Sequence, residues 1–322
     1  MHKFLLIFLI FFATTAVGQK TQKANIIFDT DIGPDYDDVG AIAILHVLEE
    51  KGQANILATV ASNKYEGVAA ILNIFNTYFK RAEIPTGVPK GHAPSLKDPQ
   101  HWTDSLLLNY PHKIKFNSEV PDAVKVYRKV LSEQPNNSVT VVTVGFFTNL
   151  FNLLNSPPDE FSSLPGKELV KRKVKLLVSM GGWFPSGREF NIYTDARSSK
   201  EALEYWPTEV IFSGFEIGKN IKTGIPLIRN SLIKNSPVKD AFSIAIPKSP
   251  TDSAGRMSWD ETTVLVAVKG VKPYFDLREG KIKINDDGSN TWDVKGKGQF
   301  YLIQKEDPER VAEVINALMM ER

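Results

Sequence analysis

The sequence of 322 residues contains no cysteine, and this absence excludes several kinds of chemistry. Disulfide bonds, catalysis by a thiolate and lipid attachment at a cysteine are all ruled out. Cysteine usage therefore says nothing about the compartment, and any prediction of export depends on the N-terminal segment alone.

An excess of charge of one sign is also lacking. The chain carries 39 Lys and Arg residues against 37 Asp and Glu residues. One of those lysines lies within residues 1–18, so the rest of the chain holds 38 basic and 37 acidic side chains, a formal charge of +1. This balance argues against a nucleic-acid-binding surface and against polybasic docking to a membrane.

Hydrophobic runs long enough to span a membrane are absent, and the most apolar segment is a short run at the N-terminus. Lys3 precedes an unbroken apolar run over residues 4–12, and Ala16-Val17-Gly18 supplies the small residues of a cleavage site. Residues 1–18 are therefore predicted to be a secretory signal peptide, with an uncleaved anchor as the alternative. Because the run is too short to span a bilayer, we expect an exported protein, periplasmic or secreted, without a stable membrane anchor.

Residues 19–322 show no internal repeat and no low-complexity linker that would divide them. Their length is ordinary for one large α/β enzyme domain. Short apolar stretches alternate with helical patterns, and the clearest of these stretches are residues 56–60, 138–144, 174–180 and 210–215. This alternation predicts a three-layer α/β domain with a mainly parallel, mixed sheet flanked by helices.

A small β-hairpin is predicted near the C-terminus. Lys281 to Asn285 and Gln299 to Gln304 lie on either side of a polar stretch that contains Asp286-Asp287-Gly288. Two strand-like segments around such turn residues favour antiparallel pairing.

Five aspartates follow a strand-like apolar segment that ends at Phe28. They are Asp29, Asp31, Asp35, Asp37 and Asp38, and a helical pattern continues from Val39 to Leu48. The end of a buried strand and the start of a helix is where open α/β sheets bind ligands. Desolvated like charges repel one another, and a hard divalent cation with oxygen ligands removes that conflict. The cluster predicts a metal site; the alternative is a solvated acidic turn that caps the helix.

Four segments of the chain form an ordered set. DTDIGPDYDD comes first, at residues 29–38, and is followed by VTVVTVGFFTNL, SMGGWFPSGREFNIYTDARSSKEAL and SWDETTVLVAV, which ends at residue 268. In this order they resemble the inosine-uridine-preferring nucleoside hydrolase family: its N-terminal aspartate signature, its Gly-x-x-Thr-Asn helix start, its Glu-Phe-Asn segment and its C-terminal metal aspartate. The resemblance implies that residues 19–322 form one nucleoside-hydrolase-like catalytic domain.

Carried over position by position, the resemblance implies a calcium site. Its ligands would be the side chains of Asp31, Asp38 and Asp260 and the backbone carbonyl of Val144. Asp29 would orient its neighbours from behind.

The resemblance also implies a sugar site beside the calcium. Asp37 would bind the ribose 2′- and 3′-hydroxyls, and Glu189 and Asn191 would hold the sugar. Asn63 matches a family asparagine near the sugar and the metal. The expected partner is a small-molecule ribonucleoside, and the oligomeric state, a homo-oligomer included, is left open.

The implied reaction is hydrolysis of the N-glycosidic bond to give ribose and a free base. Calcium would hold and polarise a water, while Asp31 accepts its proton during attack on C1′. Fixed carboxylates would stabilise the oxocarbenium character of the sugar. Buried carboxylates that bind hydroxyls would reject 2′-deoxy substrates.

Three departures from the family pattern bear on the substrate. Many relatives have a histidine just before the C-terminal aspartate as leaving-group acid, whereas here that residue is Trp259. Trp183 replaces a sugar-site asparagine, and two extra residues interrupt the aspartate signature. The purine-specific branch of the family has a tryptophan just before the C-terminal aspartate, as this chain does. Trp259 is therefore expected to stack on a purine, which favours a role in purine nucleoside catabolism. The alternative for Trp259 is a core tryptophan.

Two other functions compete with this interpretation. Residues 26–31, IIFDTD, also look like the opening of a haloacid-dehalogenase-type phosphatase, although Gly33 stands where that pattern has Thr or Val. The missing histidine motivates the second alternative, an exported nucleoside- or ribose-binding protein with a non-catalytic calcium pocket. Asp195 is interpreted as a helix cap.

Overall fold

The computed structural model describes residues 23–321. The predicted signal peptide, residues 1–18, lies outside this range. Among the described residues, none of the helices combines the length and the apolar character needed to cross a membrane.

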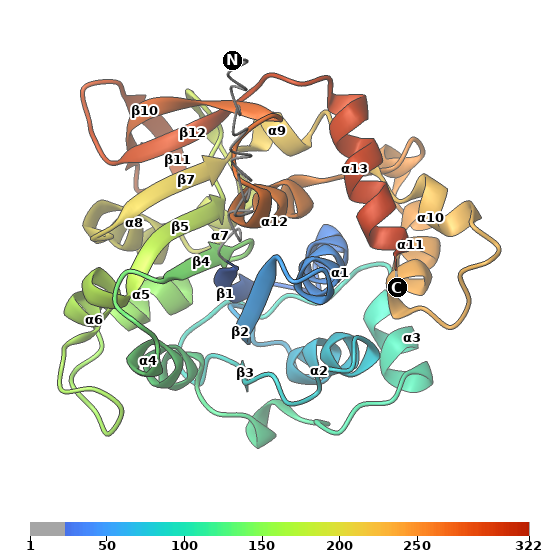
Figure 1. Ribbon diagram of the computed structural model, residues 1–322, viewed down its shortest axis with the longest axis horizontal. Coiled ribbons are helices and arrows are strands. Elements are labelled where there is room, and N and C mark those ends of the chain that lie inside the picture. The colour runs from blue at the N-terminus through green and yellow to red at the C-terminus, as the bar shows by residue number, and fades with distance from the viewer. Residues whose placement is uncertain (1–22, 322) are drawn as a thin grey trace, which may run out of the picture.

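A ten-stranded sheet runs through the molecule in the order β3-β2-β1-β4-β5-β7-β12-β10-β11-β6 (Figure 1). Strands from β3 to β12 in this order are parallel, and β10, β11 and β6 pair antiparallel at one edge. The sheet contains β1 (Ala24–Thr30), β2 (Ala54–Ala61), β3 (Thr86–Gly87), β4 (Val139–Thr143), β5 (Val174–Met180), β6 (Ser186–Arg188), β7 (Glu209–Ser213), β10 (Phe275–Ile284), β11 (Ser289–Asp293) and β12 (Gln299–Gln304). A separate antiparallel pair joins β8 (Lys222–Thr223) to β9 (Arg256–Met257).

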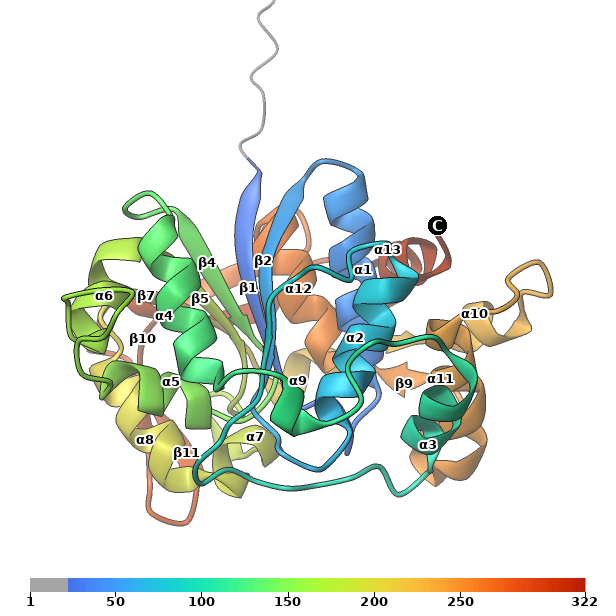
Figure 2. The same cartoon turned by 90° about the horizontal axis from the view of Figure 1, so that it is seen from below.

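Helices cover both faces of this sheet, as the two perpendicular views show (Figures 1 and 2). One face carries α1 (Asp37–Glu50), α2 (Val68–Tyr78), α12 (Trp259–Lys269) and α13 (Pro308–Met320), with α3 (Trp102–Asn109), α10 (Ile225–Arg229) and α11 (Pro237–Ala245) outside them. The other carries α4 (Ala123–Glu133), α5 (Thr148–Leu154), α6 (Gly166–Lys173) and α8 (Ala196–Tyr205). The short helices α7 (Phe190–Thr194) and α9 (Phe215–Gly218) follow β6 and β7.

Alternation along the strands creates the two cores. In β1, Ile26 and Phe28 face the core under α1 and α12, whereas Ile27 between them faces the core under α4 and α5. Side chains of successive strand residues point to opposite faces, so a strand that is apolar throughout needs cover on both. The predicted three-layer, mainly parallel sheet is confirmed.

The C-terminal hairpin is present, although its second strand differs from the predicted one. β10 turns through Asn285–Gly288 into β11, with Ile284 opposite Asn290. Gly288 takes a φ of 78°, which glycine adopts without strain. The predicted partner, residues 299–304, pairs instead with Phe275–Gly280 in the first half of β10.

The predicted strand over residues 210–215 is shorter than expected. β7 ends at Ser213, and Phe215 opens α9. Gly214 allows the chain to turn there, because a Cβ at this position would lie 2.6 Å from the ring of Phe184. The apolar pattern continued through Phe215 because its ring lines a cavity rather than continuing the strand.

The loop between β5 and α7 is attached to the hairpin. β6, within this loop, pairs antiparallel with β11. The amide of Trp183 donates to the Asn290 side chain at 3.0 Å, and the Asn290 side chain donates back to the Trp183 carbonyl at 2.9 Å. The hairpin therefore fixes the segment that leads into Glu189.

Candidate active site

Residues from distant parts of the chain line one cavity at the carboxyl ends of the parallel strands. They are Asp31, Asp35, Asp37, Val144, Met180, Glu189, Phe190, Asn191, Phe215, Trp259 and Asp260. Because β1, β4, β5 and β7 are parallel neighbours, the segments that follow them open at the same edge of the sheet. Of the predicted site residues, this arrangement places Asp31, Asp37, Val144, Glu189, Asn191, Trp259 and Asp260 at one cavity.

Three buried carboxylates come close enough to share a cation. Oxygens of Asp37, Asp38 and Asp260 lie within 4.8 Å of one another. The predicted ligand set had Asp31 in place of Asp37. Asp31 lines the same cavity, and its Oδ2 atom, like that of Asp38, is buried without a partner among the described residues. Orphaned buried carboxylate oxygens are the donor set that a hard divalent cation fits.

Burial raises the pKa of the carboxyl groups of Asp31, Asp38 and Asp260 well above their usual range, and repulsion from neighbouring aspartates raises it further. Thr30, at the end of β1, donates its hydroxyl to Asp38 and partly opposes this shift. Repulsion of this kind is what a bound cation relieves, since it favours the charged form of each acid.

The Val144 carbonyl, a predicted calcium ligand, already has a partner. It accepts a hydrogen bond from the Asn191 side chain at 2.9 Å. A carbonyl oxygen has two lone pairs, so this bond leaves one of them for a cation. The bond also fixes Asn191 against the end of β4.

Glu189 is held by backbone amides at the start of α7. Its carboxylate accepts from the amides of Asn191, Ile192 and Gly182 at 2.7, 3.2 and 3.0 Å. Burial raises the pKa of Glu189 to about 7, although these amide bonds lower it. The residue thus combines a helix-capping role with a place on the cavity wall.

Two predicted residues lie behind the cavity rather than on its wall. Asp29 accepts from the Tyr127 hydroxyl at 2.8 Å and from the Asn149 side chain at 3.1 Å, which links β1 to α4 and α5. Asn63 donates to the backbone carbonyls of Asp31 and Leu96 at 3.0 and 2.7 Å. Its amide therefore ties the loop after β3 to the acidic turn.

Aromatic rings form one side of the site. The ring of Trp259 stacks on Phe215 at 5.2 Å between centroids, and Trp183 also packs on Phe215 at 4.4 Å. The Trp259 indole donates to the Phe215 carbonyl at 2.8 Å. From the sequence, Phe215 was assigned only to the end of the predicted strand 210–215; a place at the carboxyl end of a parallel strand is the signal that could have put it at the site.

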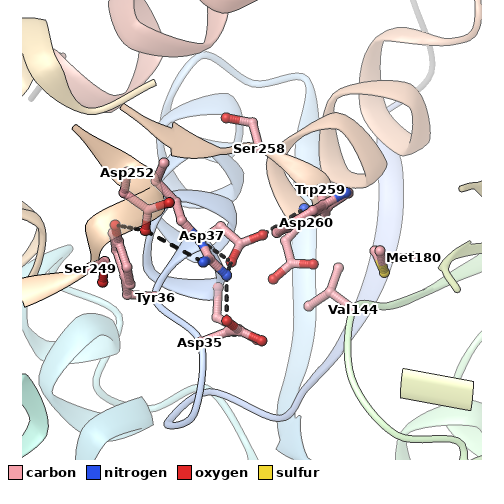
Figure 3. A network of polar contacts seen from close by, with 12 residues as sticks. Asp35, Tyr36, Asp37, Val144, Met180, Ser249, Asp252, Ser258, Trp259 and Asp260 are labelled. Atoms are coloured by element: carbon pink, nitrogen blue, oxygen red, sulfur yellow. Dashed lines mark hydrogen bonds and ion pairs between the residues drawn. The ribbon is translucent and has the colours of Figure 1, made fainter. Parts of the chain in front are cut away.

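Arg256, in β9, is a second residue of this site that sequence reasoning missed. Its guanidinium donates to Asp37 and Asp35 and lies 3.7 Å from Asp252 (Figure 3). A single arginine before the SWDE segment gives no pattern, so only the geometry finds it. Asp195, in contrast, caps α8 as predicted, accepting from the Ser198 amide.

Comparisons with known proteins identify the family of the chain and proteins of similar fold. Residues 26–320 match the family model described as inosine-uridine preferring nucleoside hydrolase. A comparison with curated proteins found no match.

Solved structures of similar fold include a plant nucleoside hydrolase, with a TM-score of 0.70 and 16% identity, covering 94% of this chain and 100% of the other. An inosine-guanosine nucleoside hydrolase has a TM-score of 0.69 and 17% identity, with 93% and 99% covered. A Bacillus anthracis inosine-uridine preferring nucleoside hydrolase has a TM-score of 0.68 and 14% identity, with 92% and 99% covered. Since the family model spans nearly the whole described chain, the protein belongs to the inosine-uridine preferring nucleoside hydrolase family.

Proposed function

We propose that this protein is a calcium-dependent, exported hydrolase that cleaves the N-glycosidic bond of ribonucleosides, with purine nucleosides preferred. The observation that carries the proposal is the convergence of Asp260 with Asp31 and Asp38 beside a cavity that Glu189 and Asn191 also line. Family membership supports the reaction class.

The residues present fit a calcium ion. Asp31, Asp38, Asp260 and the Val144 carbonyl would hold it with hard oxygen ligands. When bound, calcium would supply positive charge that lowers the pKa of a nearby water and offsets repulsion among the acids. The two orphaned oxygens, Oδ2 of Asp31 and of Asp38, support this assignment.

Each remaining residue has a role that its position supports. Asp31, on the cavity wall, would accept the proton of the attacking water. The sugar would be bound and oriented by Asp37, Glu189 and Asn191. The carboxylates of Asp37 and Glu189 would stabilise positive charge developing on the ring. Asp29 and Asn63 would hold the acidic turn in place from behind.

The base would lie against Trp259 and Phe215. Stacking of a base on an aromatic side chain contributes about 1–3 kcal/mol and is strongest for large ring systems. No histidine lines the cavity within the described residues. Purines, whose larger rings gain more from stacking, are therefore the preferred substrates in this proposal.

The decisive assay measures reducing-sugar release from a panel of ribonucleosides, with calcium and with a chelator. We expect purine ribonucleosides to be cleaved, chelation to abolish cleavage, and calcium to restore it. Asp31→Asn is expected to lower kcat by about 100-fold or more while the protein stays folded. Asp98→Asn, which changes a buried aspartate that accepts from the Thr103 amide in α3, serves as the control and should stay active.

One observation favours a second candidate, a non-catalytic nucleoside-binding protein: among residues 23–321, no histidine lines the cavity to act as leaving-group acid. The same assay decides between the two. Saturable binding of inosine by calorimetry, without release of hypoxanthine under any condition, would support binding without catalysis. The phosphatase alternative has no support from the family match, and turnover of p-nitrophenyl phosphate would revive it.

A further inference from the structure

Arg256 is a buried cation placed among the acids of the site. The residue is 8% exposed, and it comes from β9, four residues before Asp260. Its Nε and Nη2 atoms donate to Oδ1 of Asp37 at 3.0 and 2.7 Å, and Nη2 also donates to Asp35. A planar guanidinium can serve two carboxylates at once, whereas the single ammonium of lysine cannot reproduce that geometry.

Two aromatic rings and a third carboxylate fix the position of this guanidinium. It lies 4.8 Å from the centre of the Tyr36 ring and 5.2 Å from that of Trp259. Tyr36 is itself anchored, since its hydroxyl donates to Asp252 at 2.5 Å and its ring packs edge-on against Phe242. Arg256 therefore has a fixed position, from which it can fix the positions of the carboxylates that it contacts.

Asp37 has two competing uses, and Arg256 decides between them. Its oxygens are near enough to Asp38 and Asp260 to join a cation site. However, Oδ1 already accepts two hydrogen bonds from Arg256, and Oδ2 lies 3.4 Å from the Asp260 amide. Coordination of a cation by both oxygens would require Asp37 to leave the guanidinium, because Arg256 already occupies Oδ1. The arginine thus keeps this carboxylate facing the cavity as an acceptor for hydroxyl groups.

Asp35 and Tyr36 occupy the stretch where this chain is two residues longer than the usual aspartate signature. Neither residue is idle, because Tyr36 packs under Arg256 and Asp35 lines the cavity. The Asp35 side chain is 35% exposed, and its Oδ1 atom is the one bonded to Arg256. Its other carboxylate oxygen points away from this bond in Figure 3, and the residue lines the cavity.

From these contacts we propose that Arg256 is a positioning residue that holds Asp37 for the sugar and presents Asp35 to the cavity as an additional substrate acceptor. The inference rests on the proposed function and deepens it. It predicts a substrate with one hydrogen-bond donor beyond the 2′,3′-diol, a hydroxyl or amino group that Asp35 would accept.

The first test compares Arg256→Met and Arg256→Lys with the parent protein. For each, kcat/KM is measured on a ribonucleoside and on its 2′-deoxy counterpart, and calcium affinity is measured by calorimetry. We expect the preference for the ribonucleoside to fall by about tenfold or more, because a misplaced acceptor no longer discriminates the hydroxyl. Calcium affinity should be unchanged or higher in Arg256→Met, since a positive charge has been removed from the site, and unchanged in Arg256→Lys.

A matched control is Arg128→Met. Arg128 is also buried and bonds both oxygens of one aspartate, Asp159, at 2.6 and 2.9 Å, but it lies away from the cavity. Its substitution should lower stability without changing the discrimination between the two sugars. If Arg256→Met does not fold, Arg256→Lys, which retains the charge, carries the test. Unchanged discrimination in the Arg256 variants, or a calcium affinity that falls together with sugar affinity, would overturn the proposal.

The second test concerns Asp35 alone. Asp35→Asn should raise KM for the preferred nucleoside by about fivefold or more, the expected loss for one charged acceptor. It should leave the discrimination against 2′-deoxy substrates unchanged, because Asp37 remains in place. An unchanged KM across the whole nucleoside panel would remove Asp35 from the substrate site.

The same variants distinguish failure of this inference from failure of the proposed function. Binding of D-ribose and of 2-deoxy-D-ribose is measured by calorimetry, which needs no turnover. A parent protein that binds ribose but releases no base would contradict the hydrolase proposal, and the ratio of the two affinities would still test Arg256. A parent protein that hydrolyses nucleosides, with Arg256 variants that discriminate equally well, would contradict only the inference.

Discussion

Asp37 shows how the role of a residue depends on neighbours that are remote in the sequence. It is the first residue of α1 and lies in a cluster of acids, where repulsion alone would raise its pKa. Burial raises the pKa of Asp37 to about 6, while the Arg256 guanidinium lowers it. The hydrogen bonds between the two side chains join residues 219 positions apart.

Trp259 should matter more for large bases than for small ones. Trp259→Ala removes the ring that stacks on Phe215 beside the cavity. We expect kcat/KM for purine nucleosides to fall by about tenfold or more, and for pyrimidine nucleosides by less, since stacking grows with ring area. Steady-state kinetics on inosine and uridine measure both.

The control for this prediction is Trp206→Ala, which removes a buried tryptophan that bonds Thr208 outside the cavity. It should not change the ratio of purine to pyrimidine activity. Equal losses on inosine and uridine in Trp259→Ala would make Trp259 a core residue rather than a stacking platform.

Glu189 makes the stability of the protein depend on pH. Burial raises its pKa from 4.5 to about 7. Between these two values the unfolded chain releases the proton while the folded chain retains it, so the contribution of Glu189 to the free energy of unfolding falls as pH rises. Below pH 4.5 the carboxyl is protonated in both states, and this contribution is complete.

Urea denaturation of the parent protein and of Glu189→Gln at several pH values measures this contribution as a difference. The stability of the parent relative to the variant should decline from about pH 4.5 to 7 and then level off. A difference that stays flat over this window would show that Glu189 is already ionised in the folded protein.

Much of the candidate site could be predicted because its residues lie in short motifs. Asp31, Asp37, Glu189, Asn191, Trp259 and Asp260 each stand in one of the four ordered segments, and the structure brings them to one cavity. Arg256 and Phe215 could not be predicted in the same way. Their positions depend on tertiary contacts, with Asp35 and Asp37 for the arginine and with two tryptophans for the phenylalanine.

At the scale of elements, strands were predicted better than their pairing. The apolar runs that became β4, β5 and β7 were found because strands covered on both faces are apolar throughout. The partner of residues 299–304 was wrong because both candidate partners lie in one continuous strand, β10. Hydrophobic pattern marks a strand but does not choose between its two halves.

The packing of α1 against α12 leaves no room for a side chain at Gly40. A Cβ there would lie 2.1 Å from Oε1 and 2.7 Å from Cδ of Glu261, a fully buried residue of α12. Alanine normally stabilises a helix interior by about 1 kcal/mol over glycine, but overpacking costs about 1–3 kcal/mol. We therefore expect Gly40→Ala to lower the free energy of unfolding by about 1–2 kcal/mol.

Gly91→Ala is the matched control, because nothing lies within 4 Å of a Cβ at that position. Chemical denaturation of both variants measures the effect, and Gly91→Ala should be neutral. A stabilised Gly40→Ala would mean that the two helices can separate to admit a methyl group.

At the scale of the whole molecule, a bound cation should connect the segment after β1 to the start of α12 and so stabilise the fold. Asp31 and Asp38 follow β1, whereas Asp260 opens α12 near the C-terminus. Since a ligand that binds only the folded state stabilises it by mass action, saturating calcium should raise Tm by about 5 °C over chelated protein. Differential scanning calorimetry with calcium, magnesium and chelator measures the shift.

Asp260→Asn should lose most of this calcium-dependent shift. The shift should also be smaller with magnesium, which demands a tighter octahedral arrangement than a site of buried carboxylates and a carbonyl readily offers. A Tm that does not respond to calcium in the parent protein would contradict the proposed metal.

The pairing of β6 with β11 reaches beyond the edge of the sheet. This pairing and the bonds between Asn290 and Trp183 attach the loop that leads into Glu189 to the C-terminal hairpin rather than to the central strands. Regions that share hydrogen bonds tend to open together as one cooperative unit. In the proposed function, opening of the hairpin would therefore loosen Glu189 around the sugar while the acidic turn stays closed, so that ribose would leave and the cation would stay bound.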